Sequence, residues 1–147
     1  MADNEAGFTF TRVFDATPQQ VWQAWTDPDK AAQWWHPRGM TTPRSSVTID
    51  AKPGGTYEYT MVDDLSGEEH PTGGTYREVI ENEKLIFTWG HPGDVHAPVV
   101  TITIEDLGEL TRMTFELRGV EGVSGDGSYY DGWESAIDSF AAFLAAG

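Results

Sequence analysis

The stretch SYYDGWESAIDSFAAFLA, residues 128–145, predicts a long helix at the C-terminal end of the chain. Its large apolar side chains recur three or four residues apart, which places them on one continuous helical face. They are Tyr130, Trp133, Ile137, Phe140 and Leu144. The acidic residues Asp131, Glu134 and Asp138 fall on the opposite side. We therefore expect the helix to bury its apolar face and to expose these three acids.

Gly132 lies inside this expected helix, where glycine costs about 1 kcal/mol relative to alanine. A glycine at such a position usually marks the close approach of another backbone or of a ligand. We expect the helix to pass close to one or the other there.

Upstream of the helix, the apolar pattern changes to a period of two, which is typical of strands with one buried face. Short turns rich in Gly, Pro and Asn separate the segments, so neighbouring strands should pair antiparallel. The expected strands are Phe8–Phe14, Ser45–Asp50, Thr56–Val62, Gly73–Ile80, Leu85–Trp89, Val99–Glu105 and Thr111–Leu117.

Two short helices are expected between the first two strands. Thr17 can cap the first helix, Pro18 suits its first turn, and Gln20 stands where a capping-box partner belongs. Asp27 and Pro28 form a second pair of capping residue and first-turn proline, and they predict a second helix that runs through Trp34. Both starts are specified locally, by the residues next to them.

These elements predict an α+β fold, in which a curved antiparallel sheet of six to seven strands wraps around the long C-terminal helix. That helix is the only expected element long enough to cover one face of the sheet. A strongly curved sheet that closes on one helix leaves room for a pocket. The 147 residues fit a single domain, 1–147, with residues 1–6 expected to be disordered.

The composition excludes several classes of function. The chain carries 24 acidic and 9 basic residues, a formal charge of −15, so neither nucleic acid nor an anionic membrane surface is an expected partner. It has no cysteine, no apolar run long enough for a membrane helix and no basic, apolar leader, and we expect a cytoplasmic location. Its four histidines lie far apart in sequence, so no metal site and no cofactor are expected.

Five stretches carry a family resemblance that spans almost the whole chain. The chain resembles the START-like (SRPBCC, polyketide cyclase) superfamily, which has the helix-grip fold, and within it the Aha-type branch named after the activator of the heat-shock-chaperone ATPase. The stretches are RVFDATPQQVWQAWTDPDKAAQWWHPRGM (12–40), KPGGTYEYTM (52–61), GGTYREVIENEKLIFTW (73–89), TITIEDLGELTRMTFE (101–116) and DGWESAIDSFAAFL (131–144). The resemblance implies an apolar cavity between sheet and helix.

Amphipathic aromatic residues on the inner face of the sheet and helix are the candidate lining of that cavity. Their OH and NH groups need partners when buried, which suits a bound molecule better than a plain core. The expected ligand-binding residues are Trp35, His36, Tyr57, Tyr59, Trp89, Tyr130 and Trp133. The expected ligand is a small hydrophobic or aromatic molecule.

Two other functions stay open on the sequence. The chain could be a protein-interaction or co-chaperone-like module that acts on a heat-shock chaperone ATPase, using an outer surface. It could also be a cyclase- or hydrolase-type enzyme that uses polar groups of the pocket. No catalytic residue is expected, because no serine stands in a nucleophile motif and no acid–base pair has a recognisable spacing.

The excess of negative charge predicts that salt stabilises the fold. Nine basic residues leave most of the 24 acidic ones without a partner of their own. Added salt shortens the reach of their repulsion from about 30 Å at 0.01 M to about 3 Å at 1 M. Melting curves across NaCl concentration should show a rising melting temperature. A flat or falling one would contradict the prediction.

Overall fold

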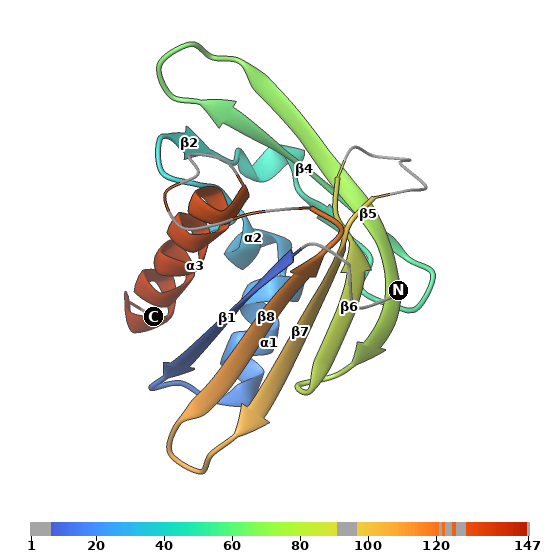
Figure 1. Cartoon of the computed structure of the whole chain (residues 1–147), viewed down its shortest axis with the longest axis vertical. Coiled ribbons are helices and arrows are strands. Elements are labelled where there is room, and N and C mark those ends of the chain that lie inside the picture. The colour runs from blue at the N-terminus through green and yellow to red at the C-terminus, as the bar shows by residue number, and fades with distance from the viewer. Residues whose placement is uncertain (1–6, 91–96, 121, 123–124, 126–128, 147) are drawn as a thin grey trace.

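A computed structural model describes residues 7–90, 97–120, 122, 125 and 129–146, most of which are drawn as coloured ribbon in Figure 1. The described chain builds an eight-stranded antiparallel sheet in the order β1-β8-β7-β6-β5-β4-β2, with β3 paired to β4. The strands are β1 (Gly7–Phe14), β2 (Met40–Thr41), β3 (Thr48–Ile49), β4 (Thr56–Asp63), β5 (Glu69–Ile80), β6 (Lys84–Thr88), β7 (Val99–Asp106) and β8 (Thr111–Arg118). Residues 1–6, expected to be disordered, lie outside the described part.

The α+β architecture predicted from the sequence is confirmed, with eight strands in place of the expected six to seven, an earlier start of β5 at Glu69 in place of Gly73, and the following local corrections. The sheet gains β2, a pair of residues too short to show any period. The strand expected at Ser45–Asp50 shrinks to β3, because Arg44–Ser46 forms a turn of 3-10 helix, η2. The expected second helix ends at Ala31 and not at Trp34, since the chain continues beyond it in turns.

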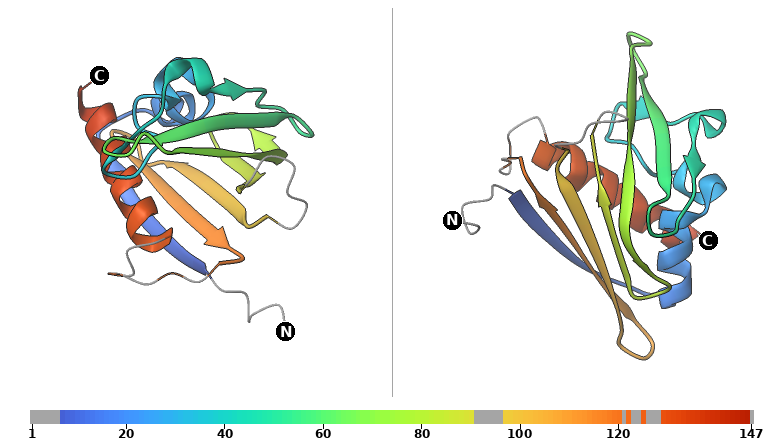
Figure 2. Two further views of the ribbon diagram at one scale, coloured as in Figure 1. Left: turned by 90° about the horizontal axis from the view of Figure 1, so that it is seen from above. Right: turned by 90° about the vertical axis from the view of Figure 1, so that its right-hand side faces the viewer.

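Three α-helices cover one side of the sheet, as Figure 1 and Figure 2 show from three directions. They are α1 (Pro18–Thr26), α2 (Pro28–Ala31) and α3 (Tyr129–Ala146). Thr17 caps α1 in a full capping box with Gln20, and the Asp27 side chain accepts a hydrogen bond from the Asp29 N–H at the start of α2. Within the described residues, no helix is both long and apolar enough to cross a bilayer.

Helix α3 buries the face that its spacing predicted. Trp133, Ile137 and Phe140 are buried, whereas Leu144 at the far end is only partly so. Asp138 is exposed, as expected, but Asp131 and Glu134 are half-buried. The Asp131 carboxylate accepts a hydrogen bond of 2.8 Å from the N–H of Gly125, which explains why that acid does not project freely into solvent.

The core is built around the indole of Trp25, which is 1 % exposed. Its ring lies within 6.5 Å, centroid to centroid, of six other aromatic rings. They are Trp34, Trp35, Phe87, Phe115, Trp133 and Phe140. One side chain of α1 therefore contacts the turn after α2, the sheet and α3.

Replacing Phe140 by alanine should lower the free energy of unfolding by about 3–5 kcal/mol. The ring is fully buried and contacts the rings of Phe14, Trp25 and Trp34, so its loss leaves a cavity among three rigid neighbours. Urea unfolding measures the change, with Asp138→Ala on the exposed side of the same helix as the matched control. Equal losses in the two variants would contradict the assignment.

Candidate functional site

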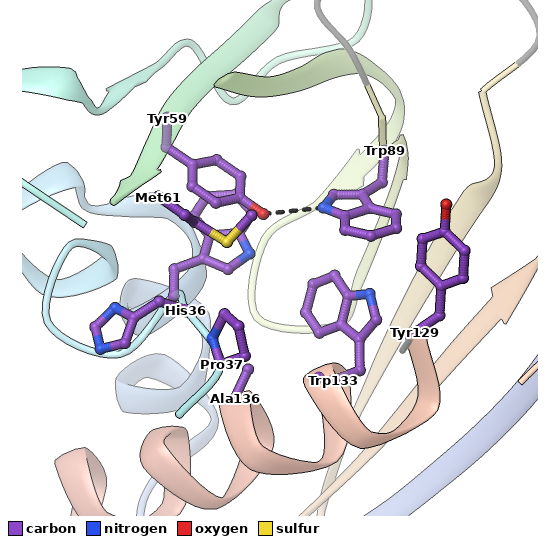
Figure 3. Close-up of a pocket in the computed structure, with 10 residues that line it drawn as sticks. His36, Pro37, Tyr59, Met61, Trp89, Tyr129, Trp133 and Ala136 are labelled. Carbon is purple, nitrogen blue, oxygen red and sulfur yellow. Dashed lines mark hydrogen bonds between the residues drawn. The ribbon is translucent and has the colours of Figure 1, made fainter. Parts of the chain in front are cut away.

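A pocket of about 140 Å³ opens between β4, the residue that follows β6, and the first turns of α3. Figure 3 shows its lining side chains, which come from four separate parts of the chain. Five of them are aromatic: Trp35, Tyr59, Trp89, Tyr129 and Trp133. The rest of the wall is formed by His36, Pro37, Met61, Gly132 and Ala136. The lining is therefore mostly apolar and rigid.

The inner wall is a stack of rings set by the alternation of β4. Tyr57 and Tyr59 point to the same face of the strand, and the indole of Trp35 lies against both. Ring centroids are 4.1 Å apart for Trp35 and Tyr59 and 5.2 Å apart for Trp35 and Tyr57, with the planes within 21° of parallel. The stack holds Trp35 and Tyr59 in fixed positions on the wall of the pocket.

The opposite wall is held by Trp89, which links the sheet to α3. Its Nε1–H donates to the Tyr59 hydroxyl over 2.9 Å, the dashed line in Figure 3. Its ring meets the edges of Trp133 at 5.2 Å and Tyr129 at 5.8 Å. Tyr129 and Trp133 are one helical turn apart on α3, so both reach the same side of the pocket.

The start of α3 is tied to the segment before β2 by hydrogen bonds. The N–H of Arg38 donates to the Ser135 hydroxyl over 3.0 Å, and that hydroxyl donates to the Gly132 carbonyl over 3.0 Å. A side chain carbon added at Gly132 would meet only Pro37, at 3.9 Å. No neighbouring backbone therefore requires a glycine here, and its lack of a side chain leaves space between α3 and Pro37.

His36 is held at the edge of the pocket with its imidazole turned away from the aromatic rings, as Figure 3 shows. The Thr42 hydroxyl donates to the Trp35 carbonyl over 2.7 Å, so it accepts from His36 Nδ1, 3.2 Å away. Desolvation lowers the pKa of His36, an effect that the charge of Asp64 opposes. Through Thr42, the ring helps to position the Trp35 segment at the edge of the pocket.

Five of the seven residues named from the sequence line this pocket: Trp35, His36, Tyr59, Trp89 and Trp133. Tyr57 lies one layer behind, where its hydroxyl donates to the Thr88 carbonyl over 2.7 Å. Tyr130 lies elsewhere, with its ring against Phe8 and Phe10 of β1 at 5.2 and 4.9 Å.

Sequence reasoning missed Tyr129, Met61, Pro37 and Ala136 as lining residues. Met61 could have been found, because it shares the inward parity of Tyr57 and Tyr59 on β4. Tyr129 carried the signal of lying four residues before Trp133 on the same helical face. Gly132, expected to mark the close approach of a backbone or a ligand, lines the pocket and has no neighbouring backbone against it.

No group of three or more metal-binding side chains occurs among the described residues. Of the four histidines, His70 lies 3.4 Å from the Glu68 carboxylate on the surface of the β4–β5 hairpin. His91 and His96 fall outside the described residues. A wider hollow of about 440 Å³, lined partly by Glu69 and His70, shares Met61, Trp89 and Tyr129 with the aromatic pocket.

Known proteins share this architecture. The family model described as Activator of Hsp90 ATPase homolog 1-like protein matches residues 15–145. A crystal structure of a protein from Chromobacterium violaceum is 28 % identical, with 94 % of this chain and 96 % of that one covered and a TM-score of 0.81. The AHSA1 protein from Silicibacter pomeroyi is 25 % identical, with 96 % and 99 % covered and a TM-score of 0.79. No curated protein sequence matches the chain.

The buried tyrosines predict an unusual alkaline titration. Burial raises the pKa of Tyr57, Tyr59 and Tyr76 well above the ordinary value. These three of the five tyrosines should keep their protons near pH 10. The ultraviolet absorbance of phenolate should therefore be lower in the folded protein than in the protein unfolded by urea.

The same shift sets the sign of the pH dependence of stability. Unfolding releases these phenols to lose protons at about pH 10, so the free energy of unfolding should fall as pH rises above that value. Tyr76→Phe removes one of the three groups and is the matched variant. Five phenolates forming together near pH 10 in the folded protein would contradict the burial.

Proposed function

The chain belongs to the family of Activator of Hsp90 ATPase homolog 1-like proteins, and from its pocket we propose that it binds a small, flat apolar molecule. The observation that carries the proposal is an aromatic-walled cavity of about 140 Å³ between the sheet and α3. Cavities of about 150 Å³ with apolar walls take up benzene. The volume therefore suits a single aromatic ring.

The way in which α3 borders the cavity supports binding over simple packing. The helix presents Gly132 and Ala136 to a wall made mostly of large aromatic rings. Larger apolar residues at these two positions would fill the space and add stability, since protein interiors are normally close-packed. The helix instead keeps the space open, at the cost of a glycine in its interior.

Within this proposal, Trp35, Tyr59, Trp89 and Trp133 form the binding surface, and Tyr129 stands at the mouth, 44 % exposed. The ring stack on Trp35 and the Trp89–Tyr59 hydrogen bond hold the walls before a ligand arrives. A pre-formed site loses little side-chain entropy on binding. His36 and Tyr57 act behind the surface, by positioning Trp35.

The two alternative functions, a co-chaperone-like module and an enzyme, have less structural support. Action on a heat-shock chaperone ATPase follows from the printed name of the family alone. The large apolar side chains exposed in the described chain are spread over β1, β5, α3 and the β4–β5 and β7–β8 turns, and exposed apolar residues of this kind are normal for any surface. Catalysis is disfavoured because the imidazole of His36 is turned away from the aromatic rings and burial raises the pKa of the Tyr59 phenol. The proposed location remains the cytoplasm.

Replacing Gly132 by leucine should block the pocket without unfolding the protein. The new side chain enters a space where a Cβ meets only Pro37, so it competes directly with the ligand. Affinity for toluene, followed by proton–nitrogen NMR of the indole groups, should fall about tenfold or more, equivalent to about 1.4 kcal/mol, because the leucine side chain occupies the volume that the ring would take.

Gly132→Ala is the matched control. It should raise the free energy of unfolding by up to about 1 kcal/mol and keep toluene binding, because a methyl group leaves most of the volume free. Undiminished binding in the leucine variant would place the ligand elsewhere. If toluene and other single-ring compounds leave the indole signals of Trp89 and Trp133 unchanged in the unaltered protein, the proposed function is wrong.

A further inference from the structure

A wide hollow of about 640 Å³ adjoins the aromatic pocket and shares Pro37 and Gly132 with it. Three carboxylates line this hollow, those of Asp63, Asp64 and Asp131. They come from the end of β4, the turn after it and the first turn of α3. Among the described residues that line it, Arg38 is the one with a basic side chain. Negative charge therefore prevails next to the pocket at the start of α3.

A second hollow, of about 440 Å³, adjoins the pocket at Trp89 and Tyr129. Glu69 lines it, and the Nε2 atom of the neighbouring His70 lies 3.4 Å from the carboxylate of Glu68. In the part of the chain that the structure describes, neither Lys nor Arg lines this hollow or the aromatic pocket. Both hollows therefore carry an excess of negative charge at any pH where histidine is neutral.

Neutral donors orient two of the carboxylates in the first hollow. The Asp63 carboxylate accepts from the N–H groups of Ser66 and Leu65 over 3.0 and 2.9 Å, and these bonds lower its pKa. The Asp64 carboxylate accepts from the Thr41 hydroxyl over 2.7 Å. A neutral donor fixes and stabilises the charged form of a carboxylate and adds no positive charge beside it. Their negative charge thus remains to act on a ligand.

The basic residues of the chain compensate acids elsewhere. All nine lie in the described part, because the remaining segments contain no Lys or Arg. Most of them pair with acidic side chains that line neither hollow. These paired residues are Lys30, Arg44, Lys52, Lys84, Arg112 and Arg118. The formal charge of −15 is therefore poorly compensated around the pocket.

We propose that the pocket prefers a flat aromatic cation without N–H groups, of the N-alkylpyridinium class, to a neutral ring of the same shape. This inference rests on the proposed function and adds the charge of the bound ring to it. The charges around a site sum to a potential of several kT, which concentrates ions of the opposite sign. This potential reaches about 10 Å at 0.1 M salt, so it acts without direct contact between ring and carboxylate.

The wall of the pocket suits a cation of this kind. Tryptophan and tyrosine rings attract weakly hydrated cations through their electron-rich faces. An ammonium group brings N–H donors, which need acceptors when they are buried. The Tyr59 hydroxyl already accepts from Trp89, and the imidazole of His36 is turned away from the aromatic rings. A ring nitrogen that carries an alkyl group has the positive charge and no N–H, so it leaves no donor unpaired.

N-methylpyridinium and toluene test the inference as a matched pair. They have the same shape, since a positive ring nitrogen replaces the carbon that bears the methyl group. A pocket without a preference for charge binds toluene more tightly, because removing an ion from water is costly. At 0.01 M salt and pH 8, where ordinary histidine is neutral, we expect N-methylpyridinium to bind more tightly by about 2- to 30-fold. The indole signals of Trp89 and Trp133 in proton–nitrogen NMR give both affinities.

Charge-neutral substitutions locate the source of the preference. Asp64→Asn combined with Glu69→Gln removes one carboxylate from each hollow and preserves the size of both side chains. At 0.01 M salt, this should weaken binding of N-methylpyridinium about threefold and leave toluene binding unchanged. Glu83→Gln combined with Glu109→Gln is the matched control, because both side chains are exposed in turns at the ends of β6 and β7 opposite to Trp89.

The outcomes separate this inference from the proposal beneath it. Tighter binding of the cation, with a larger loss in the hollow variant than in the control variant, supports it. If toluene binds equally or more tightly, or if the two double variants lose the same affinity for the cation, the inference fails while the proposed function stands. If neither compound moves the Trp89 and Trp133 signals, both are overturned.

Discussion

The packing of the Trp25 ring is the contact on which the rest of the structure depends. From α1 the indole reaches the turn after α2, the inner face of β6 and β8, and the inward side of α3. Its N–H finds an acceptor in the sulfur of Met113, so the ring needs no water. Because protein interiors are close-packed, a ring of this size at the centre fixes the separation of helix and sheet.

Further aromatic rings fill the space between helix and sheet, and the pocket lies at the edge of this packed cluster. Trp35 contacts Trp25 on one side and stacks on Tyr59 on the other, Tyr59 accepts from Trp89, and Trp89 meets Trp133. Each member of this series is positioned by its neighbours and not by solvent. The walls of the site are therefore rigid, which distinguishes it from a loosely packed corner of the core.

Local signals in the sequence were sufficient wherever structure is decided locally. The capping box at Thr17 and the cap at Asp27 could be recognised because cap and partner are three residues apart or fewer. The alternation of β4 equally showed that Tyr57 and Tyr59 point to the same inner face of the sheet. Alternation does not show which of the two side chains lies at the pocket. Only the placement of Trp35, far away in sequence, decides which tyrosine forms the wall and which lies behind it. For the same reason Tyr129 and not Tyr130 borders the pocket, since the rotation of α3 is set by its contacts with β1.

The glycine at position 132 gives the scaffold an unusual evolutionary freedom. Function and stability normally compete, because a binding site asks for residues that the fold would replace. Here that competition is concentrated at one helical position whose side chain would project into empty space beside Pro37. Single substitutions there could change the volume available to a ligand in graded steps, from methyl upward, without disturbing the ring network behind. Proteins on this scaffold could thus diverge in the size of molecule they accept while keeping the same core.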